Sequence, residues 1–223
     1  MIKTVILAGG YGTRLGDVTD TIPKPNLMVG NKSLIQRNIE LLIQNGFDEI
    51  VINVFHLKSR VKDHVISKFP NTKITFSDEA ELLGTGGGVK QALNYLGDES
   101  FLLINADICH EFKLDTLIMD VEYAHIVGVK NPDHNIVGDF SIDGSMVSIN
   151  NSNNMTWCGI SVINPKIFES FENIKTPYSI WNPVIYKYIE LGKVSGEFFD
   201  GFWIDTGTIE RLALANEVFK DEN

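Results

Sequence analysis

The sequence predicts an α/β protein with a Rossmann-like, doubly wound sheet, mostly parallel but mixed, and a small antiparallel lobe. Through the first half of the 223 residues, short apolar runs typical of buried strands alternate with segments typical of helices. Gly9, Gly86 and Asp107 each follow such a run, at the carboxyl strand ends where doubly wound sheets bind ligands. In the second half, Asp143-Gly144 separates two strand-like runs, which is a hairpin signal.

Local signals place the elements of the first half, about residues 1–110. Ser33 and Gln36 have the spacing of a capping box at the start of a helix, and Gly46 suits its end. The strands expected here are 4–7, 49–54, 73–76 and 101–105, and the helices are 34–46, 59–69 and a segment ending near 93.

In the second half, about residues 111–223, strands outnumber helices and do not alternate regularly with them. The expected strands are 139–142, 146–149, 156–163, 193–198 and 201–205, and the expected helices are 180–191 and 209–219. We find no linker, repeat or low-complexity segment, so residues 1–223 are expected to form one domain. The second half is expected to lie over the first as an antiparallel lobe and to leave a cleft between them.

Composition excludes several classes of protein. The formal net charge of −10 and a pI near 4.9 argue against nucleic-acid binding, which selects basic surfaces. Cys109 and Cys158 are flanked by strand-like sequence, so we expect buried thiols in a reducing compartment. The apolar run that begins at Thr4 is too short for a signal peptide or membrane span. We therefore expect a cytoplasmic protein that binds neither nucleic acid nor membrane, as a monomer or a homodimer.

The most informative segment runs from Leu7 to Lys24, where a strand-like run ends in glycines and then meets Arg14 and Lys24. Glycines let backbone N–H groups approach a ligand, and two fixed cations suit a polyphosphate. No lysine stands at the P-loop spacing, and Leu15 occupies the position of the third glycine in the dinucleotide fingerprint. The segment therefore predicts a nucleoside triphosphate site of another kind.

Four motifs in order resemble the sugar-1-phosphate nucleotidyltransferase family. They are Leu7-Ala8-Gly9-Gly10-Tyr11-Gly12-Thr13-Arg14-Leu15 with Pro23-Lys24-Pro25, then Leu83-Gly84-Thr85-Gly86-Gly87-Gly88, Asn105-Ala106-Asp107 and Trp203-Ile204-Asp205-Thr206-Gly207-Thr208. Gly138-Asp139-Phe140, Gly159-Ile160-Ser161-Val162 and Gly192-Lys193-Val194-Ser195-Gly196-Glu197 are similar to the N-acetylmuramate-1-phosphate uridylyltransferases.

The resemblance implies a nucleotide-diphospho-sugar transferase fold, with a nucleotide-binding first half and a sugar-binding second half. Its reaction is attack of a sugar-1-phosphate oxygen on the α-phosphorus of a nucleoside triphosphate, which releases pyrophosphate. Arg14, Lys24 and Asp107 are the expected catalytic residues, because neutralising and positioning two anions is the main task. Asp107 and Asp205 are expected to hold Mg²⁺, which prefers a few carboxylates together with phosphate oxygens and water.

The remaining contacts are assigned by substrate. The residues expected to bind the nucleotide are Leu7, Ala8, Gly9, Gly10, Gly12, Thr13, Arg14, Lys24, Gly84, Thr85, Gly86 and Asn105. Asp139 and Glu197 are expected to accept hydrogen bonds from the sugar phosphate. Trp157, Trp181 and Trp203 are expected to be core residues more than sugar platforms, and His110 a bystander.

Two departures from the family leave the substrates open. The muramate enzymes carry glutamate where this chain has Gly84, and Leu83-Gly84-Thr85-Gly86-Gly87 resembles heptose- and mannose-phosphate guanylyltransferases instead. Gly16-Asp17 stands where many members have Arg-Pro. UTP with N-acetylmuramate 1-phosphate is the first hypothesis, and GTP with mannose or heptose 1-phosphate is the second. A non-catalytic subunit that senses nucleotide-sugars is the alternative from another class.

Overall fold

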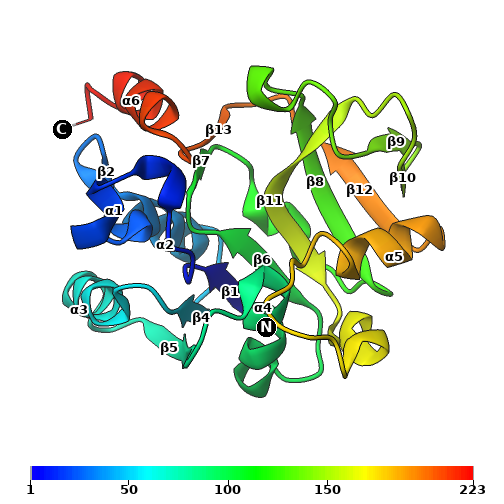
Figure 1. The fold of residues 1–223 in the computed structure, drawn as a ribbon, viewed down its shortest axis with the longest axis horizontal. Helices are drawn as coiled ribbons and strands as arrows, with labels where there is room; N and C mark the ends of the chain where they lie inside the picture. Colours follow the sequence, from blue (N-terminus) through cyan, green and yellow to red (C-terminus); the bar gives the residue numbers. More distant parts are fainter. Residues whose placement is uncertain (1, 223) are drawn as a thin grey trace.

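The computed structural model describes residues 2–222, and in that range a nine-stranded mixed sheet forms the centre of the molecule (Figure 1). The strands lie in the order β5-β4-β1-β6-β11-β8-β12-β10-β9. They are β1 (Thr4–Leu7), β4 (Glu49–Val54), β5 (Lys73–Asp78), β6 (Phe101–Asn105), β8 (Ala124–Lys130), β9 (Ser141–Asp143), β10 (Met146–Ser148), β11 (Met155–Ile163) and β12 (Val194–Phe198).

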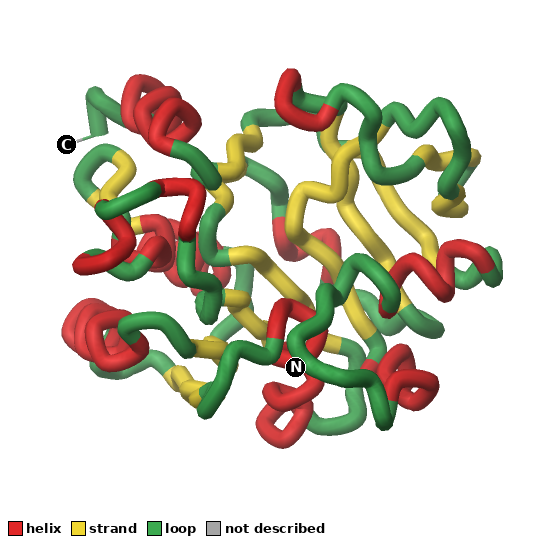
Figure 2. Tube along the Cα trace, viewed as in Figure 1, coloured by secondary structure: helices red, strands yellow, loops and turns green. Residues whose placement is uncertain are grey.

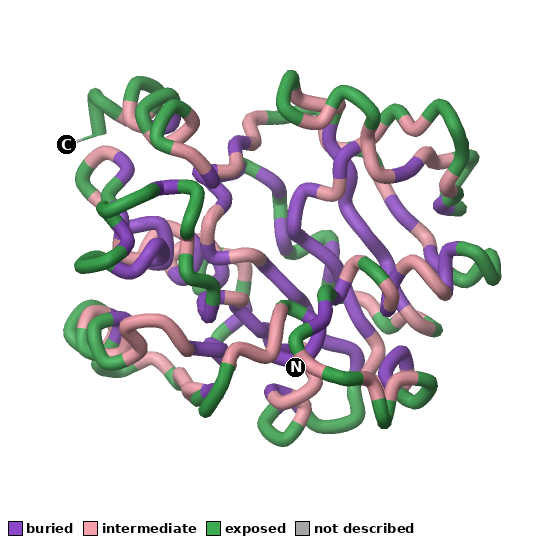
Figure 3. Tube along the Cα trace, viewed as in Figure 1, coloured by how far each residue is buried: buried purple, intermediate pink, exposed green. Residues whose placement is uncertain are grey.

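The four strands β5, β4, β1 and β6 are parallel, as the alternating pattern predicted. β1, β4 and β6 are almost entirely buried because helices cover both faces, whereas β5, at the edge of the sheet, buries only Ser77 (Figures 2 and 3). The helices are α1 (Val18–Thr21), α2 (Leu34–Gln44), α3 (Lys58–Lys68), α4 (Gly84–Leu96), α5 (Val184–Glu190) and α6 (Ile209–Val218). The carboxyl ends of β1, β4 and β6 therefore meet at one edge, where the site lies.

The second half continues the same sheet rather than folding over the first half. β11 runs antiparallel to both β6 and β8, and β12 runs parallel to β8. The predicted fold class, a mixed sheet with an antiparallel part in the second half, is confirmed. The antiparallel strands extend the sheet instead of lying over it, because β11 pairs with β6 through four consecutive residues and joins the halves into one layer. The central strand β8 was not among the strands expected from the sequence.

Two short two-stranded sheets complete the fold within residues 2–222. β2 (Met28–Val29) pairs with β3 (Lys32–Ser33), and β7 (Ile108–His110) pairs antiparallel with β13 (Trp203–Asp205). The second pair brings the end of the chain back beside the segment that follows β6. β7 was also missed, since three residues carry too little periodicity to be recognised.

The helix starts agree with local chemistry, with two differences. Ser33 caps α2 by accepting a hydrogen bond from Gln36 N at 3.2 Å, but the Gln36 side chain bonds Glu40 and does not complete the box. The helix expected from 180 begins at Val184, after Pro183, which has no backbone N–H to donate. In the described range, no helix combines the length and apolar character needed to cross a membrane.

Candidate active site

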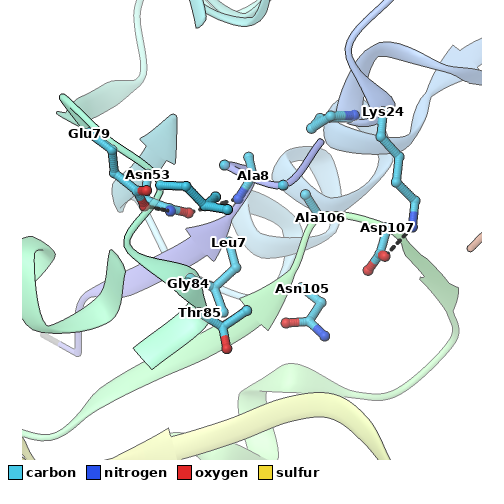
Figure 4. Close-up of a pocket in the computed structure, with 14 residues that line it drawn as sticks. Leu7, Ala8, Lys24, Asn53, Glu79, Gly84, Thr85, Asn105, Ala106 and Asp107 are labelled. Carbon is cyan, nitrogen blue, oxygen red and sulfur yellow. Dashed lines mark hydrogen bonds and ion pairs between the residues drawn. The ribbon is translucent and has the colours of Figure 1, made fainter. Parts of the chain in front are cut away.

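A first cavity of about 200 Å³ opens at the carboxyl ends of β1, β4 and β6, next to the start of α4 (Figure 4). Its walls come from segments far apart in the sequence. The lining residues are Leu7, Ala8, Gly9, Gly10, Lys24, Pro25, Asn53, Glu79, Leu82, Gly84, Thr85, Asn105, Ala106 and Asp107. Nine of the residues predicted as nucleotide-binding or catalytic are therefore in one cavity, and Gly12, Thr13, Arg14 and Gly86 lie outside its lining.

The glycine turn after β1 directs Arg14 to a different part of the site. Gly12 has a φ of 71°, and a Cβ there would be 2.9 Å from Cγ2 of Thr19, so glycine is required. The 3₁₀ turn Thr13–Leu15 follows and buries Leu15 while leaving Arg14 exposed. The Arg14 guanidinium reaches Gly207, where a Cβ would be 2.9 Å from its Nη2. Arg14 thus faces the segment that contains Asp205.

Lys24 and Asp107 form an ion pair at the boundary of the first cavity (Figure 4). Lys24 begins the 3₁₀ turn Lys24–Asn26 and exposes only 9% of its surface. The prolines on either side fix the local backbone, which holds the ammonium group in place. Asp107 follows the end of β6, as the sequence predicted for a residue at a strand end.

A second cavity of about 410 Å³ shares Asn105 and Asp107 with the first. Its other lining residues are Arg14, Ile108, His134, Asn135, Asp139, Thr156, Trp157, Cys158, Trp203 and Asp205. The two cavities are therefore continuous at the end of β6, and Asp107 faces both.

The pairing of β7 with β13 brings Asp205 to Asp107. In this antiparallel register Asp205 lies opposite Ile108, the residue after Asp107. Thr206 then donates hydrogen bonds from its N–H and its Oγ1 to the carbonyl oxygen of Asp107, both at 2.9 Å. Two carboxylates that are 98 positions apart in the sequence therefore line one cavity.

Both carboxylate oxygens of Asp205 have a side-chain partner. Arg211 Nη2 lies 2.7 Å from Oδ1 of Asp205, and His134 Nε2 lies 2.8 Å from Oδ2. His134 was not among the predicted site residues, since an exposed loop histidine carries no sequence signal. Thr208 caps α6 by accepting a hydrogen bond from Arg211 N, so Asp205 is not needed as the cap.

The donor set fits a hard divalent cation with few protein ligands. Among residues 2–222 no group of three or more His, Cys, Asp or Glu side chains has the arrangement of a complete metal cage. Two carboxylates on one cavity instead match Mg²⁺, which takes one or two carboxylates and completes its shell with water and phosphate oxygens. Asp107 and Asp205 are the residues that would hold it.

Asp139 and Glu197 occupy different environments. Asp139 lines the second cavity, where its oxygens accept hydrogen bonds from Asn135 Nδ2 at 3.0 Å and Trp157 N at 2.9 Å. Glu197 is outside the lining of both cavities, and its Oε1 contacts Nε2 of His125 at 3.1 Å. The structure therefore brings Asp139 to the site but not Glu197.

The second glycine loop approaches Tyr178. A Cβ on Gly84 would be 2.4 Å from the Tyr178 carbonyl oxygen, and one on Gly86 would be 2.4 Å from Cε2 of the ring. Gly86 N–H donates to that carbonyl at 2.9 Å. Gly84 and Thr85 still line the first cavity. The small size of Gly86 thus serves packing against Tyr178, a different reason from the one its sequence suggested.

Asn53 and Glu79 are buried polar residues of the first cavity that sequence reasoning missed. Asn53 stands in β4, and Glu79 follows β5, so both are at carboxyl strand ends, as the other site residues are. Their positions at strand ends could have indicated a role in the site. Asn53 lies inside the expected strand 49–54, and Glu79 lies between the expected strand 73–76 and the helix that follows it.

The cysteines are buried as expected, whereas the tryptophans expected in the core are only half-buried. Cys109 and Cys158 are free and buried, and burial raises their pKa values to about 11 and about 12. Trp157 stacks on Trp181 with ring centroids 5.5 Å apart, and Trp203 Nε1 donates to the Cys158 carbonyl oxygen. Trp157 and Trp203 also expose one surface to the second cavity.

Comparison with known proteins shows the family of the chain. Residues 3–129 match the family model described as nucleotidyl transferase. The chain is 36% identical to N-acetylmuramate alpha-1-phosphate uridylyltransferase of Neisseria meningitidis, over 96% of both chains. It is 30% identical to a mannose-1-phosphate guanyltransferase of Aspergillus oryzae, over 92% of this chain and 61% of that protein.

A solved structure extends the similarity to the fold. HddC from Yersinia pseudotuberculosis is 31% identical and superposes with a TM-score of 0.83, covering 99% of this chain and all of that one. A second crystal structure of HddC contains GMP-PN. By its matched residues, its site and its fold, the chain belongs to the nucleotidyl transferase family, in agreement with its resemblance to the sugar-1-phosphate nucleotidyltransferases.

Proposed function

We propose that this nucleotidyl transferase couples UTP to N-acetylmuramate 1-phosphate, or to a related hexose phosphate, and releases pyrophosphate. The observation that carries the proposal is the pair of cavities that meet at Asn105 and Asp107. The first cavity, with its glycine turn and Lys24, suits the nucleotide. The second, lined by Arg14, Asp139 and aromatic rings, suits the sugar phosphate. The reacting phosphorus then lies at their junction.

The reaction needs no covalent intermediate. An oxygen of the sugar phosphate, already ionised near pH 7, forms a bond to the α-phosphorus. The bond from that phosphorus to the β-phosphate oxygen breaks, and pyrophosphate leaves with the electron pair. The protein must therefore neutralise and align two anions. Lys24, in the first cavity, and Arg14, which lines the second, supply fixed positive charge on the two sides of the junction where the triphosphate and the sugar phosphate meet.

We further propose that Asp107 and Asp205 hold Mg²⁺, which supplies charge neutralisation to the phosphate oxygens when it is bound. Lys24 pairs with Asp107, and Arg211 and His134 pair with Asp205, so these side chains would hold the two carboxylates in place around such a cation. The substrates and the two free cysteines also fit the cytoplasm.

A panel assay of pyrophosphate release tests the proposal. It crosses UTP, GTP, CTP, ATP and dTTP with N-acetylmuramate, N-acetylglucosamine, glucose and mannose 1-phosphates, with Mg²⁺ or with EDTA. The proposal expects the largest kcat/KM with UTP and N-acetylmuramate 1-phosphate, and none with EDTA. Absence of activity with every pair would contradict an enzyme and favour a sensor of nucleotide-sugars.

Guanylyl transfer to a mannose or heptose phosphate is the second candidate. Gly84 favours it, because the muramate enzymes that this chain otherwise resembles carry glutamate there. Similarity to a mannose-1-phosphate guanyltransferase points the same way. Activity confined to GTP in the same panel would select this candidate.

A further inference from the structure

A buried chain of three hydrogen bonds joins the two walls of the first cavity, and Figure 4 shows the two that involve Asn53. Ala8 N–H donates to Oδ1 of Asn53 at 2.8 Å, and Nδ2 of Asn53 donates to Oε1 of Glu79 at 2.6 Å. Leu83 N–H then donates to Oε2 of Glu79 at 3.0 Å. The turn after β1 and the start of α4 are thereby connected through two side chains.

Burying the Glu79 carboxylate between these walls costs desolvation free energy. Asn53 exposes 3% of its surface and Glu79 only 2%. No salt bridge of the described residues 2–222 includes this carboxylate, and Lys58 donates to the carbonyl oxygen of Glu79 instead. Burial raises the pKa of Glu79, and the bonds from Leu83 and Asn53 oppose that rise. A buried acid held only by two neutral donors therefore calls for a specific role.

Glycines on both walls make room for the pair. A Cβ on Gly9 would be 2.9 Å from Nδ2 of Asn53. A Cβ on Gly88, in α4, would be 2.7 Å from both that nitrogen and Oε1 of Glu79. Distances below 3 Å are far inside van der Waals contact, so the two glycines and the two polar side chains form one packed unit. Gly9 and Gly88 thus contact the pair directly from opposite walls.

The hydrogen bonds have a fixed direction. Both ends of the chain are backbone N–H donors, so the group at residue 79 must accept at one end and Asn53 must accept at the other. Asn53 can offer only one acceptor and one donor. Residue 79 must then accept twice, which a carboxylate does and an amide does not. Glutamine at this position would leave two N–H donors facing each other.

We propose that Glu79 is a positioning residue which, through Asn53 and the Leu83 N–H, sets the two walls of the first cavity at the separation that a nucleotide requires. This inference rests on the proposed function, because it assigns the nucleotide to that cavity. Disrupting the Asn53–Glu79 pair should therefore weaken the binding of the nucleotide. The binding of the sugar phosphate should change much less, because neither residue lines the second cavity.

A set of three variants tests this role. Glu79→Gln places two N–H donors against each other. Asn53→Asp places the carboxylate of residue 53 against the carboxylate of Glu79. The double variant N53D/E79Q reverses the middle hydrogen bond, so that every donor again meets an acceptor. Since one unsatisfied buried group weakens binding roughly tenfold, each single variant is expected to raise the nucleotide KM about tenfold at pH 8. The double variant is expected to recover most of that loss.

Glu81→Gln is the matched control, because Glu81 is an exposed acid two residues further along the same loop. It is expected to retain the wild-type KM for both substrates. The assays measure the KM of each substrate and kcat, together with the melting temperature with and without UTP or GTP. A loss of folding alone would move the melting temperature of the free protein without changing the ratio of the two KM values.

Three outcomes would overturn the inference: an unchanged nucleotide KM in Glu79→Gln, an equal rise of both KM values, or a double variant no better than the singles. The last outcome would mean that the position-79 carboxylate contacts the nucleotide itself. Failure of the proposed function is a different result. In that case wild-type protein releases no pyrophosphate, while the stabilisation by nucleotide still reports on the three variants.

Discussion

The two cavities of the site are built in different ways. The first is shaped by glycines, backbone N–H groups and the buried pair Asn53 and Glu79, whose hydrogen bonds link its walls. The second is lined by Asp205, whose carboxylate is held by the side chains of Arg211 and His134. The shape of the first therefore depends on backbone and neutral hydrogen bonds, whereas the second depends on contacts between ionisable side chains.

Because of this difference, we expect the two cavities to be sensitive to different kinds of substitution. A shape made by backbone and glycine is sensitive to an added methyl group, because interiors are close-packed. A centre made of charges is sensitive to removal of a charge, because the partner group is left in a partly desolvated place. Substitutions should thus change stability at the first cavity and turnover at the junction.

The largest effect is expected for Asp107, which faces both cavities. Asp107→Asn removes a carboxylate from the junction and the partner of Lys24. Loss of one pre-organised electrostatic group lowers kcat by about 10³-fold. Pyrophosphate release measures the rate, and nucleotide stabilisation of the fold measures binding, which is expected to persist. Asp115→Asn, on an exposed surface, is the control, and equal rates in the two variants would refute a role at the junction.

Lys24→Met is expected to have the second largest effect. It removes a buried ammonium group beside Asp107, and we expect a loss of about 10²-fold in kcat/KM. Lys175→Met, in an exposed loop, should stay within about twofold of the wild type. Steady-state kinetics with both substrates checks this, and a Lys24→Met enzyme with full activity would exclude Lys24 from the phosphate site.

A smaller effect, on stability, separates two glycines of the first cavity region. Gly86→Ala places a methyl group 2.4 Å from the Tyr178 ring, whereas Gly10→Ala meets no heavy atom within 4 Å. Overpacking is expected to lower the free energy of unfolding by about 2 kcal/mol, and Tm by about 6 °C, in the first variant alone. Thermal unfolding compares them. Equal Tm values would show that the loop can move away from Tyr178.

The smallest effect concerns the buried thiols. Raised pKa values keep Cys109 and Cys158 protonated at pH 8, so reaction with iodoacetamide should be at least about tenfold slower than for an unfolded chain. Since pH 8 lies below both values, raising the pH toward 11 should first speed the reaction at Cys109. Mass spectrometry of the native and urea-unfolded protein measures this. Rapid labelling of the native protein would contradict the buried positions.

Local sequence patterns were enough to predict the parallel half of the fold and most of the residues that line the first cavity. Buried strands such as β1 and β6 are apolar runs bounded by turn residues, and parallel strands place their carboxyl ends together, so local pattern was enough. The glycine turn, Arg14, Lys24 and Asp107 could be recognised for the same reason.

The way in which the second half joins the first, and the contacts between ionisable side chains in the site, depend on tertiary structure and could not be predicted from the sequence. The pairing of β11 with β6, and of β13 with β7, connects residues that are far apart along the chain, and strand pairing of this kind leaves no local periodicity. The contacts of His134 and Arg211 with Asp205 arise from those pairings. The Asn53–Glu79 pair likewise depends on the relative positions of three strand ends, which no single segment of sequence encodes.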